Sequence, residues 1–273
     1  MSGTIRKVTA TLGFTGPVNG KPRYHANDTS LDVMNVIQTP VPIEDIRTWD
    51  AAPSLDVEGF HLYHHESAVS DFTNVEEVAR IHGEEIRQLL LEVSGADQVE
   101  VTGKPILRFG EKSQSSGALD NSRPARFVHI DASDATSQGF FERFRSQHPR
   151  AVKRFVQFNV WRALSPPPQD VPLAVCDART ISPEDLVPAD AMFDRDGRIV
   201  FSFEGLILKH NPRQRWAYYP GMTASDALVF KTHDSDRGRA HFVPHGAFDD
   251  PSCPPGVTPR CSVEMRGMAV WYA

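Results

Sequence analysis

The sequence predicts a mainly β protein with flanking helices, arranged as a double-stranded β-helix (a cupin-like jelly roll). Short apolar and β-branched runs, separated by Gly, Pro and Asn turns, fill the second half of the chain, whereas the clearest helix lies in the first half. The 21 prolines also favour short strands and ordered loops over long helices. Because no linker or repeat divides the 273 residues, we expect one domain over residues 1–273.

Composition narrows the class of protein. The chain is 40% hydrophobic and 23% charged, as ordinary globular proteins are, and its formal net charge of -6 argues against a nucleic-acid partner. No apolar run approaches the roughly 20 residues of a membrane span, and none follows Arg6 and Lys7 as a secretory signal requires. The three cysteines, Cys176, Cys253 and Cys261, lack the spacing of a zinc site, so we expect reduced thiols in a cytoplasmic protein.

One strong helical pattern stands in the first half. Apolar residues recur at helical spacing from Val75 to Val93, Asn74 can cap the start, and Gly95 can end the helix. The strands expected around it are 5–12, 31–37, 41–46, 59–65 and 99–109. The Gly-, Ser- and Asn-rich stretch 110–124 is expected to be a loop, either a lid over a site or a disordered connection.

Short strands dominate the second half. The expected strands are 126–131, 153–162, 173–176, 198–208, 216–219, 228–232, 239–244 and 262–272. A short helix is expected at 140–148 and a helical turn at 183–186.

The first chemical signal is the pair His129 and Asp131 in the expected strand 126–131. Side chains two positions apart on a strand point to the same face. An imidazole and a carboxylate on one face are two parts of the 2-His-1-carboxylate triad that holds non-haem Fe(II) in oxygenases. The adjacent histidines His64 and His65 are a weaker metal signal, because neighbouring residues on a strand point to opposite faces.

A jelly-roll oxygenase needs a second histidine far downstream. The candidates after Asp131 are His210, His233, His241 and His245. Fifteen residues after His245 comes Arg260, followed at the second position by Ser262. The distal carboxylate of 2-oxoglutarate needs a planar bidentate donor, which a guanidinium offers, and a hydroxyl on the same face can share that carboxylate. The alternatives are an ordinary surface arginine at this position and Arg266 as the anchor.

Several blocks of sequence together resemble one oxygenase family. They are His129-x-Asp131, Asn159-Val160-Trp161-Arg162, Tyr218-Tyr219-Pro220-Gly221-Met222-Thr223, Lys231-Thr232-His233-Asp234-Ser235, Pro244-His245-Gly246-Ala247-Phe248-Asp249-Asp250-Pro251 and Pro259-Arg260-Cys261-Ser262-Val263-Glu264-Met265-Arg266. Over about residues 30–272 the chain is similar to the family of the cephamycin 7-alpha-hydroxylation component, the gibberellin-desaturase-like proteins and the fungal hydroxylase/desaturases of secondary metabolism.

The resemblance implies a jelly roll that uses Fe(II), 2-oxoglutarate and O2. It implies a small secondary-metabolite or amino-acid-derived substrate that is hydroxylated, desaturated or cyclised, with release of succinate and CO2. By position it implies His129, Asp131 and His245 as iron ligands, and Arg260 and Ser262 as contacts of 2-oxoglutarate. It thereby favours His245 over His241. The chain departs from the family pattern at Ala132, where a glutamine is expected.

Five further residues are candidate contacts: Asn159, Trp161, Arg162, Tyr218 and Tyr219. Asn159 and Trp161 share one face of their expected strand, and Arg162 lies on the other unless a bulge intervenes. Asn159 and Arg162 are expected at the co-substrate, and Trp161 with the two tyrosines at the substrate. The alternative is a core tryptophan and a structural arginine.

Two other interpretations stay open. One is a cupin-like metalloenzyme that does not use 2-oxoglutarate, with a structural Arg260. The other is a non-catalytic jelly-roll binding protein. A serine hydrolase is poorly supported, because the chain has no Gly-x-Ser-x-Gly elbow, and neither a Walker-type loop nor a dinucleotide fingerprint occurs.

Overall fold

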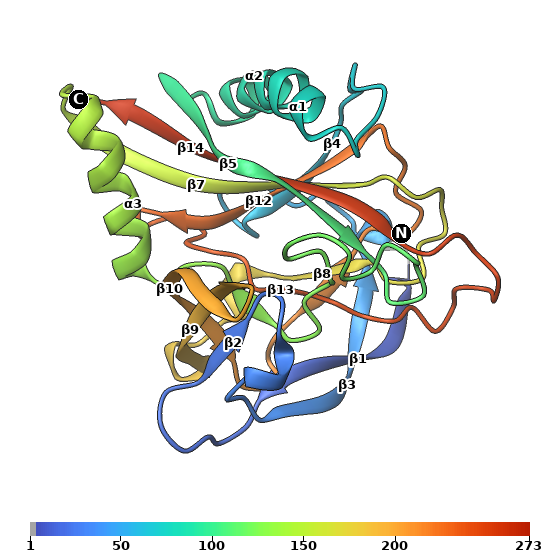
Figure 1. Cartoon of the computed structure of the whole chain (residues 1–273). Helices are drawn as coiled ribbons and strands as arrows, with labels where there is room; N and C mark the ends of the chain where they lie inside the picture. Colours follow the sequence, from blue (N-terminus) through green and yellow to red (C-terminus); the bar gives the residue numbers. More distant parts are fainter. Residues whose placement is uncertain (1–3) are drawn as a thin grey trace.

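Two β-sheets packed face to face make up the structure, a computed structural model that describes residues 4–273 (Figure 1). The larger sheet has the order β1 (Lys7–Thr15), β3 (Val36–Asp45), β11 (Trp216–Tyr218), β8 (Leu173–Cys176), β13 (His245–Ala247), β6 (His129–Ile130), β10 (Arg198–Leu208), β9 (Leu186–Arg195) and β2 (Arg23–His25). The smaller has the order β4 (Phe60–His64), β12 (Asp226–Asp234), β7 (Val152–Ala163), β14 (Cys261–Tyr272) and β5 (Gln98–Phe109). Two sheets of this kind confirm the predicted jelly roll.

The helices lie outside the sheets. The first is α1 (Val75–Glu77), which continues through a π-helical turn (Val78–His82) into α2 (Gly83–Ser94), and together these cover the outer face of the smaller sheet (Figure 1). The predicted boundaries are confirmed, because the Asn74 side chain accepts a hydrogen bond from the backbone N–H of Glu77 and Gly95 adopts a left-handed φ of 64°. Within residues 4–273 no helix has the length and apolar character needed to span a membrane.

Helix α3 (Asp134–Gln147) begins earlier than predicted. The Ser133 side chain accepts a hydrogen bond from the backbone N–H of Thr136, so Ser133 caps the helix and the polar residues that follow it form the first turns. Phe141 then stacks on Phe155 of β7 with ring centroids 4.1 Å apart, which fixes α3 against one end of the smaller sheet.

Three predicted strands differ from the structure. The strand predicted at 126–131 is only two residues long in β6, and the segment 239–244 is a loop. The strand predicted at 31–37 starts at Val36, after a short helical turn. Strand β9 was not predicted, because Pro188 and several Ala and Asp residues give it low strand propensity, and its pairing with β10 overrides that propensity.

The inner faces of the two sheets place the site. His129 of β6 and His245 of β13 are paired across the larger sheet, and Asp131 follows β6 directly. Opposite them, β7 of the smaller sheet presents Asn159 and Trp161 from one face, as its alternation predicts. Apolar residues of the other face of β7, Val156 and Val160 among them, pack against α2.

Candidate active site

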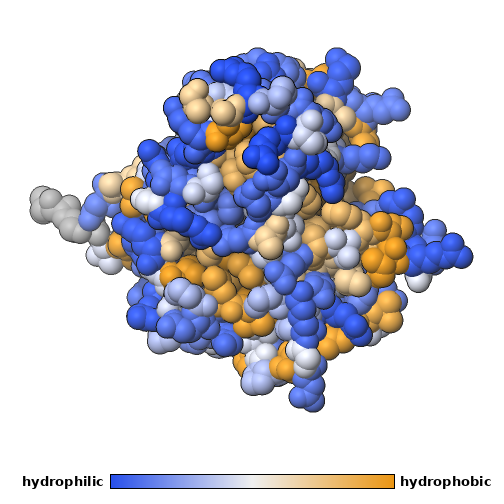
Figure 2. All heavy atoms as spheres, turned by 90° about the vertical axis from the view of Figure 1, so that its left-hand side faces the viewer, coloured by the Kyte–Doolittle hydropathy of each residue, from blue (hydrophilic) through white to orange (hydrophobic). Residues whose placement is uncertain are grey.

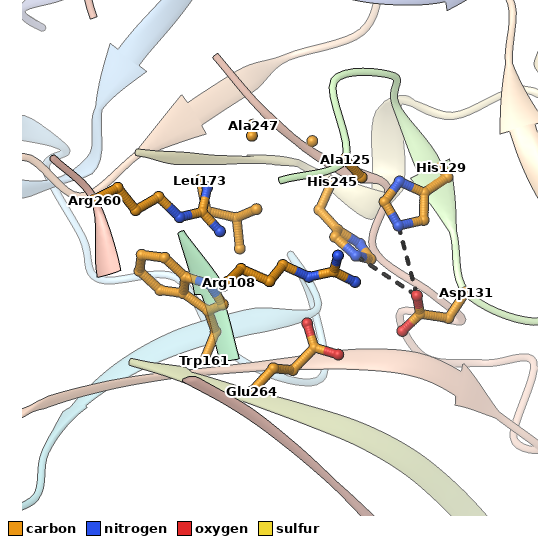
Figure 3. Close-up of a pocket in the computed structure, with 11 residues that line it drawn as sticks. Arg108, Ala125, His129, Asp131, Trp161, Leu173, His245, Ala247, Arg260 and Glu264 are labelled. Carbon is orange, nitrogen blue, oxygen red and sulfur yellow. Dashed lines mark ion pairs between the residues drawn. The ribbon is translucent and has the colours of Figure 1, made fainter. Parts of the chain in front are cut away.

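His129, Asp131 and His245 converge on one point between the sheets. The Nε2 atoms of His129 and His245 lie 3.6 and 3.9 Å from the same oxygen, Oδ1 of Asp131 (Figure 3). One potential ligand atom from each side chain lies within 4.8 Å of the others. The two nitrogens and one carboxylate oxygen match the donor set of a non-haem Fe(II) site that keeps positions open for other ligands.

Backbone carbonyls set the orientation of both imidazoles. His129 Nδ1 lies 3.1 Å from the carbonyl oxygen of Phe127, and His245 Nδ1 lies 3.1 Å from that of Val243. Because a carbonyl only accepts hydrogen bonds, each Nδ1 carries the proton and each Nε2 presents its lone pair. Burial, reinforced by the neighbouring His129, lowers the pKa of His245 to about 3, so this ring is neutral and able to bind a metal.

Polar neighbours hold the carboxylate of Asp131. Asn159 Nδ2 donates a 2.6 Å hydrogen bond to Oδ2, and an Nη atom of Arg266 lies 3.4 Å from the same oxygen. Burial opposes ionisation, but Arg266 and the two histidines hold the pKa of Asp131 well below its usual range. The ionised carboxylate therefore turns Oδ2 toward Asn159 and Arg266 and leaves Oδ1 toward the histidines.

The other candidate histidines lie away from this point. His233 Nδ1 and His241 Nε2 approach Oδ1 of Asp134 at 3.3 and 2.7 Å, in a separate cluster at the start of α3. His210 packs edge-on against another aromatic ring. Of the four candidates, only His245 joins His129 and Asp131.

Arg260 is a buried guanidinium without an acidic partner. Its side chain is 1% exposed, its Nε donates to Oγ of Ser262 at 3.1 Å, and it lies over the ring of Trp161 at 5.2 Å. Among residues 4–273 no carboxylate forms an ion pair with it. Burial, with Arg108 and Arg126 nearby, lowers the pKa of Arg260 to about 9. A buried charge without a direct ion-pair partner favours an anionic ligand.

One pocket connects Arg260 to the triad. Figure 3 shows Arg260 at one end, His129, Asp131 and His245 at the other, and Arg108 between them. The other lining residues are Ala125, Trp161, Leu173, Gly246, Ala247 and Glu264. The indole N–H of Trp161 is buried without a hydrogen-bond acceptor in the described chain, which leaves one more donor for a ligand here.

Sequence reasoning missed Arg108 and Glu264. Arg108 is paired with Ser262 across β5 and β14, and its side chain enters the pocket between Arg260 and the triad. No local pattern in the sequence indicates this role, because it depends on the pairing of β5 with β14. Glu264 lines the same pocket and accepts a 2.9 Å hydrogen bond from Arg266.

Three predicted contacts are not brought to this pocket, contrary to expectation. Arg162 lies on the opposite face of β7, where it donates to the backbone carbonyl of His65 at 2.7 Å. The hydroxyl of Tyr218 donates to Asp250 at 3.3 Å, and Tyr219 is buried in a hydrophobic cluster. These residues support the strands around the site and line neither cavity near the triad.

The fold and the triad together define the class, a jelly-roll oxygenase of the non-haem iron type. A family model described as "Oxidoreductase/YMDC permease-like domain" matches residues 12–270, so the chain belongs to that family. The hydroxylase/desaturase asaB of Aspergillus flavus is 32% identical over 66% of this chain and 86% of its own length. The Fe(II)/2-oxoglutarate-dependent dioxygenase nvfI of Aspergillus novofumigatus is 29% identical over 81% of each chain.

Two further comparisons extend over almost the whole chain. Oxidoreductase R2 of Phoma sp. is 28% identical over 96% of both chains. A solved structure of the iron and alpha-ketoglutarate-dependent endoperoxidase NvfI superposes with a TM-score of 0.83 at 24% identity, covering 99% of this chain and all of the other, and so supports the fold. The predicted kinship with fungal hydroxylase/desaturases is confirmed, and the chain is an oxidoreductase of this iron- and 2-oxoglutarate-dependent group.

Proposed function

We propose that His129, Asp131 and His245 hold Fe(II), and that Arg260 binds the distal carboxylate of 2-oxoglutarate during oxidation of a small organic substrate by O2. The observation that carries this proposal is the buried guanidinium of Arg260, which forms no ion pair within the described chain, at the far end of the pocket that begins at the triad. In a metalloenzyme that does not use 2-oxoglutarate, Arg260 would be a structural residue held by Ser262 and by the backbone carbonyl of Val171.

The donor set fits the metal. Two neutral imidazole nitrogens and one ionised carboxylate oxygen suit Fe(II), and three ligands leave room for 2-oxoglutarate and O2. The bound iron, with 2-oxoglutarate and O2, supplies the oxidising power, and the co-substrate leaves as succinate and CO2. The C–H bond held nearest the metal would set the position of attack, and the fate of the substrate after loss of that hydrogen would decide between hydroxylation, desaturation and ring closure.

The remaining residues position these groups. Asn159 and Arg266 hold Asp131 through its second oxygen. Ser262 accepts from Nε of Arg260 and fixes the plane of the guanidinium. Trp161 closes one wall beside it. The pocket is buried between the sheets, so water is largely kept from the co-substrate.

Arg108 adjusts when the co-substrate binds. The free volume of the pocket is only about 20 Å³, room for roughly one water molecule, and the Arg108 guanidinium fills its middle (Figure 3). Its Nη1 donates to the backbone carbonyls of Asn121 and Arg123. In this proposal the guanidinium, already held by that loop, shifts aside as the dianion enters and supplies a second positive charge.

Anaerobic titration of Fe(II) and 2-oxoglutarate tests the assignment through the visible metal-to-ligand charge-transfer band of the chelate. The wild type should develop the band, and His245→Ala should abolish it, whereas His64→Ala, at an exposed histidine, should not. Arg260→Met should raise the Kd for 2-oxoglutarate about tenfold to a hundredfold. Arg213→Met, at an exposed arginine outside the pocket, is the matched control.

Each alternative gives a different result. Iron binding without a band would favour a metalloenzyme that does not use 2-oxoglutarate. Failure of the wild type to bind iron would favour a non-catalytic binding protein. An unchanged Kd for 2-oxoglutarate in Arg260→Met would show that the anchor lies elsewhere.

A further inference from the structure

A second and much larger cavity meets the triad from the other side. We name it the aromatic chamber; its walls come from β5, the segment 119–121, α3 and the hairpin formed by β9 and β10. Its volume of about 1070 Å³ slightly exceeds the 300–1,000 Å³ or so that is usual for sites of drug-sized ligands. Asp131 is the one described residue that lines both this chamber and the Arg260 pocket.

The strand register shows that the two cavities use different parts of β14. Arg266 of β14 is paired with Asn159 of β7, and both contact Asp131. Toward one end of β14 lies Arg260 with the narrow pocket. Toward the other end, Gly267 and Met268 line the aromatic chamber. A substrate in the chamber and a co-substrate at Arg260 can therefore reach the metal site together.

Phenylalanines form much of the chamber wall. Phe193, Phe201 and Phe203 of the hairpin lie within 5.4–5.8 Å of one another, measured between ring centroids. Phe203 also meets Phe140 of α3, edge to face, at 5.9 Å. Such a wall offers large apolar area and ring-stacking contacts to a ligand.

Apolar side chains also reach the surface at the hairpin tip. Ile199, Val200 and Phe201 are 45%, 60% and 44% exposed, and Val200 is the extra residue of a β-bulge in the pairing of β9 with β10. Figure 2 shows this face of the molecule, where apolar side chains break the hydrophilic surface. Exposed apolar residues beside a cavity are typical of ligand-binding sites.

Most polar groups deep in the chamber are paired, whereas Lys104 and Arg143 lie at its exposed rim. Arg266 contacts Glu264 and Asp131, and Arg195 binds Asp120. Gln157 Nε2 donates to a backbone carbonyl of α3 at 3.2 Å. Nε of Arg266 is the one buried donor of the chamber lining that lacks an acceptor in the described chain. Apart from Asp131, the carboxylates that line the chamber, Glu100 and Asp120, are about half exposed, so the desolvation of an amino acid's ammonium group would go uncompensated deep inside.

From these features we propose that the aromatic chamber binds the primary substrate, and that this substrate is a bulky, mainly apolar molecule with fused rings or long hydrocarbon parts. The inference rests on the proposed iron site and narrows the expected substrate class, because it excludes free amino acids and other small hydrophilic molecules. Ala132 lines the chamber next to Asp131. Its methyl group, in place of a longer side chain, leaves the approach to the metal site open.

A neutral fluorescent probe tests the proposal on the whole protein. N-phenyl-1-naphthylamine would be titrated into protein loaded anaerobically with 2-oxoglutarate and either Co(II) or diamagnetic Zn(II). Saturable binding with a blue-shifted emission is expected. The probe's proton relaxation should be enhanced with Co(II) and not with Zn(II), because the chamber adjoins the metal site. Free L-proline and L-arginine should not displace the probe.

Matched variants locate the binding site. Phe201→Asp should weaken probe binding about tenfold or more, because it places a charge in the apolar wall. Ile37→Asp changes an equally exposed apolar residue on β3, outside the chamber, and should bind as the wild type does. Circular dichroism and the unfolding midpoint establish that both variants are folded, and Phe203→Ala gives a second test without a new charge.

Two results would overturn the inference. One is probe binding with equal proton relaxation in the Co(II) and Zn(II) proteins, or probe binding by Phe201→Asp and Phe203→Ala with the affinity of the wild type. The other is displacement of the probe by a free amino acid. Failure of the underlying iron assignment would look different, since the wild type would then lack the charge-transfer band with Fe(II) and 2-oxoglutarate even before any probe is added.

Discussion

His129 and His245 lie directly opposite each other on β6 and β13, with ring centroids 4.4 Å apart, although they come from distant parts of the sequence. This cross-strand pair gives the two imidazoles their separation, and Asp131 closes the triangle because it follows His129 by two positions. A metal site built on paired strands is rigid, since moving either histidine requires the sheet to move.

The hydrogen bond from Asn159 to Asp131 is expected to matter for metal affinity although Asn159 is not a ligand. In Asn159→Leu, a change that keeps the branched shape of the side chain, the carboxylate loses its 2.6 Å hydrogen bond. Co(II) affinity should fall about tenfold to a hundredfold, measured by anaerobic absorption titration. Asp131→Ala should bind far more weakly still. An Asn159→Leu protein with wild-type affinity would mean that Arg266 alone orients Asp131.

Local patterns in the sequence were sufficient to predict His129 and Asp131, two of the three residues of the triad. The i, i+2 spacing of His129 and Asp131 needs only a short extended segment, so it held even though β6 is two residues long. The choice of His245 over His241 depended on family resemblance, because nothing local distinguishes the two. In the structure the two differ because His245 lies in β13, which pairs with β6, whereas His241 lies in a loop.

Other features depend on how strands and helices pack together, which the spacing of apolar residues along the sequence does not indicate. Arg108 enters the pocket because of its register against Ser262, beyond a bulge that Gly103 permits with its φ of 76°. Arg162 leaves the site because alternation on β7 is regular, as one of the two sequence interpretations predicted. The chamber is assembled from α3, β5 and a hairpin whose β9 strand has low strand propensity, so its apolar character was not visible in any single segment.

Close packing of α2 on β14 makes Gly267 sensitive to substitution. A Cβ atom added at Gly267 would lie 2.5 Å from Cδ1 of Leu90. Gly267→Ala should therefore reduce the free energy of unfolding by about 1–3 kcal/mol. Gly139, exposed within α3, has no atom within 4 Å of the same added Cβ, and Gly139→Ala should stabilise the protein by about 1 kcal/mol. Urea unfolding of both variants checks the pair, and equal effects would contradict it.

The stability of the metal-free protein should fall in mild acid partly because of His233. Burial, with His241 beside it, lowers the pKa of His233 to about 4. The unfolded chain takes up a proton below about pH 6.5 while the folded ring stays neutral. The contribution of His233 to the free energy of unfolding is therefore constant above pH 6.5. As the pH falls from 6.5 toward 4, the free energy of unfolding decreases progressively.

A substitution isolates that effect. Between pH 7 and pH 5 the wild type should lose about 2 kcal/mol more unfolding free energy than His233→Gln, which has no titrating group at this position. Urea unfolding at a series of pH values measures both slopes. Parallel slopes would show that the folded protein accommodates a charged His233, whose Nδ1 lies 3.3 Å from the carboxylate of Asp134.

Arg260 and Ser262 are expected to act as one unit toward 2-oxoglutarate. Ser262→Ala removes the 3.1 Å contact that fixes the guanidinium and should raise the KM for 2-oxoglutarate about threefold to tenfold with little change in kcat. Arg260→Lys keeps the charge but loses the bidentate geometry, and should raise the KM about tenfold or more. Because Ser262 acts through Arg260, the double variant should be little worse than Arg260→Lys alone. Additive effects on KM would instead mean that Ser262 contacts the co-substrate independently of Arg260.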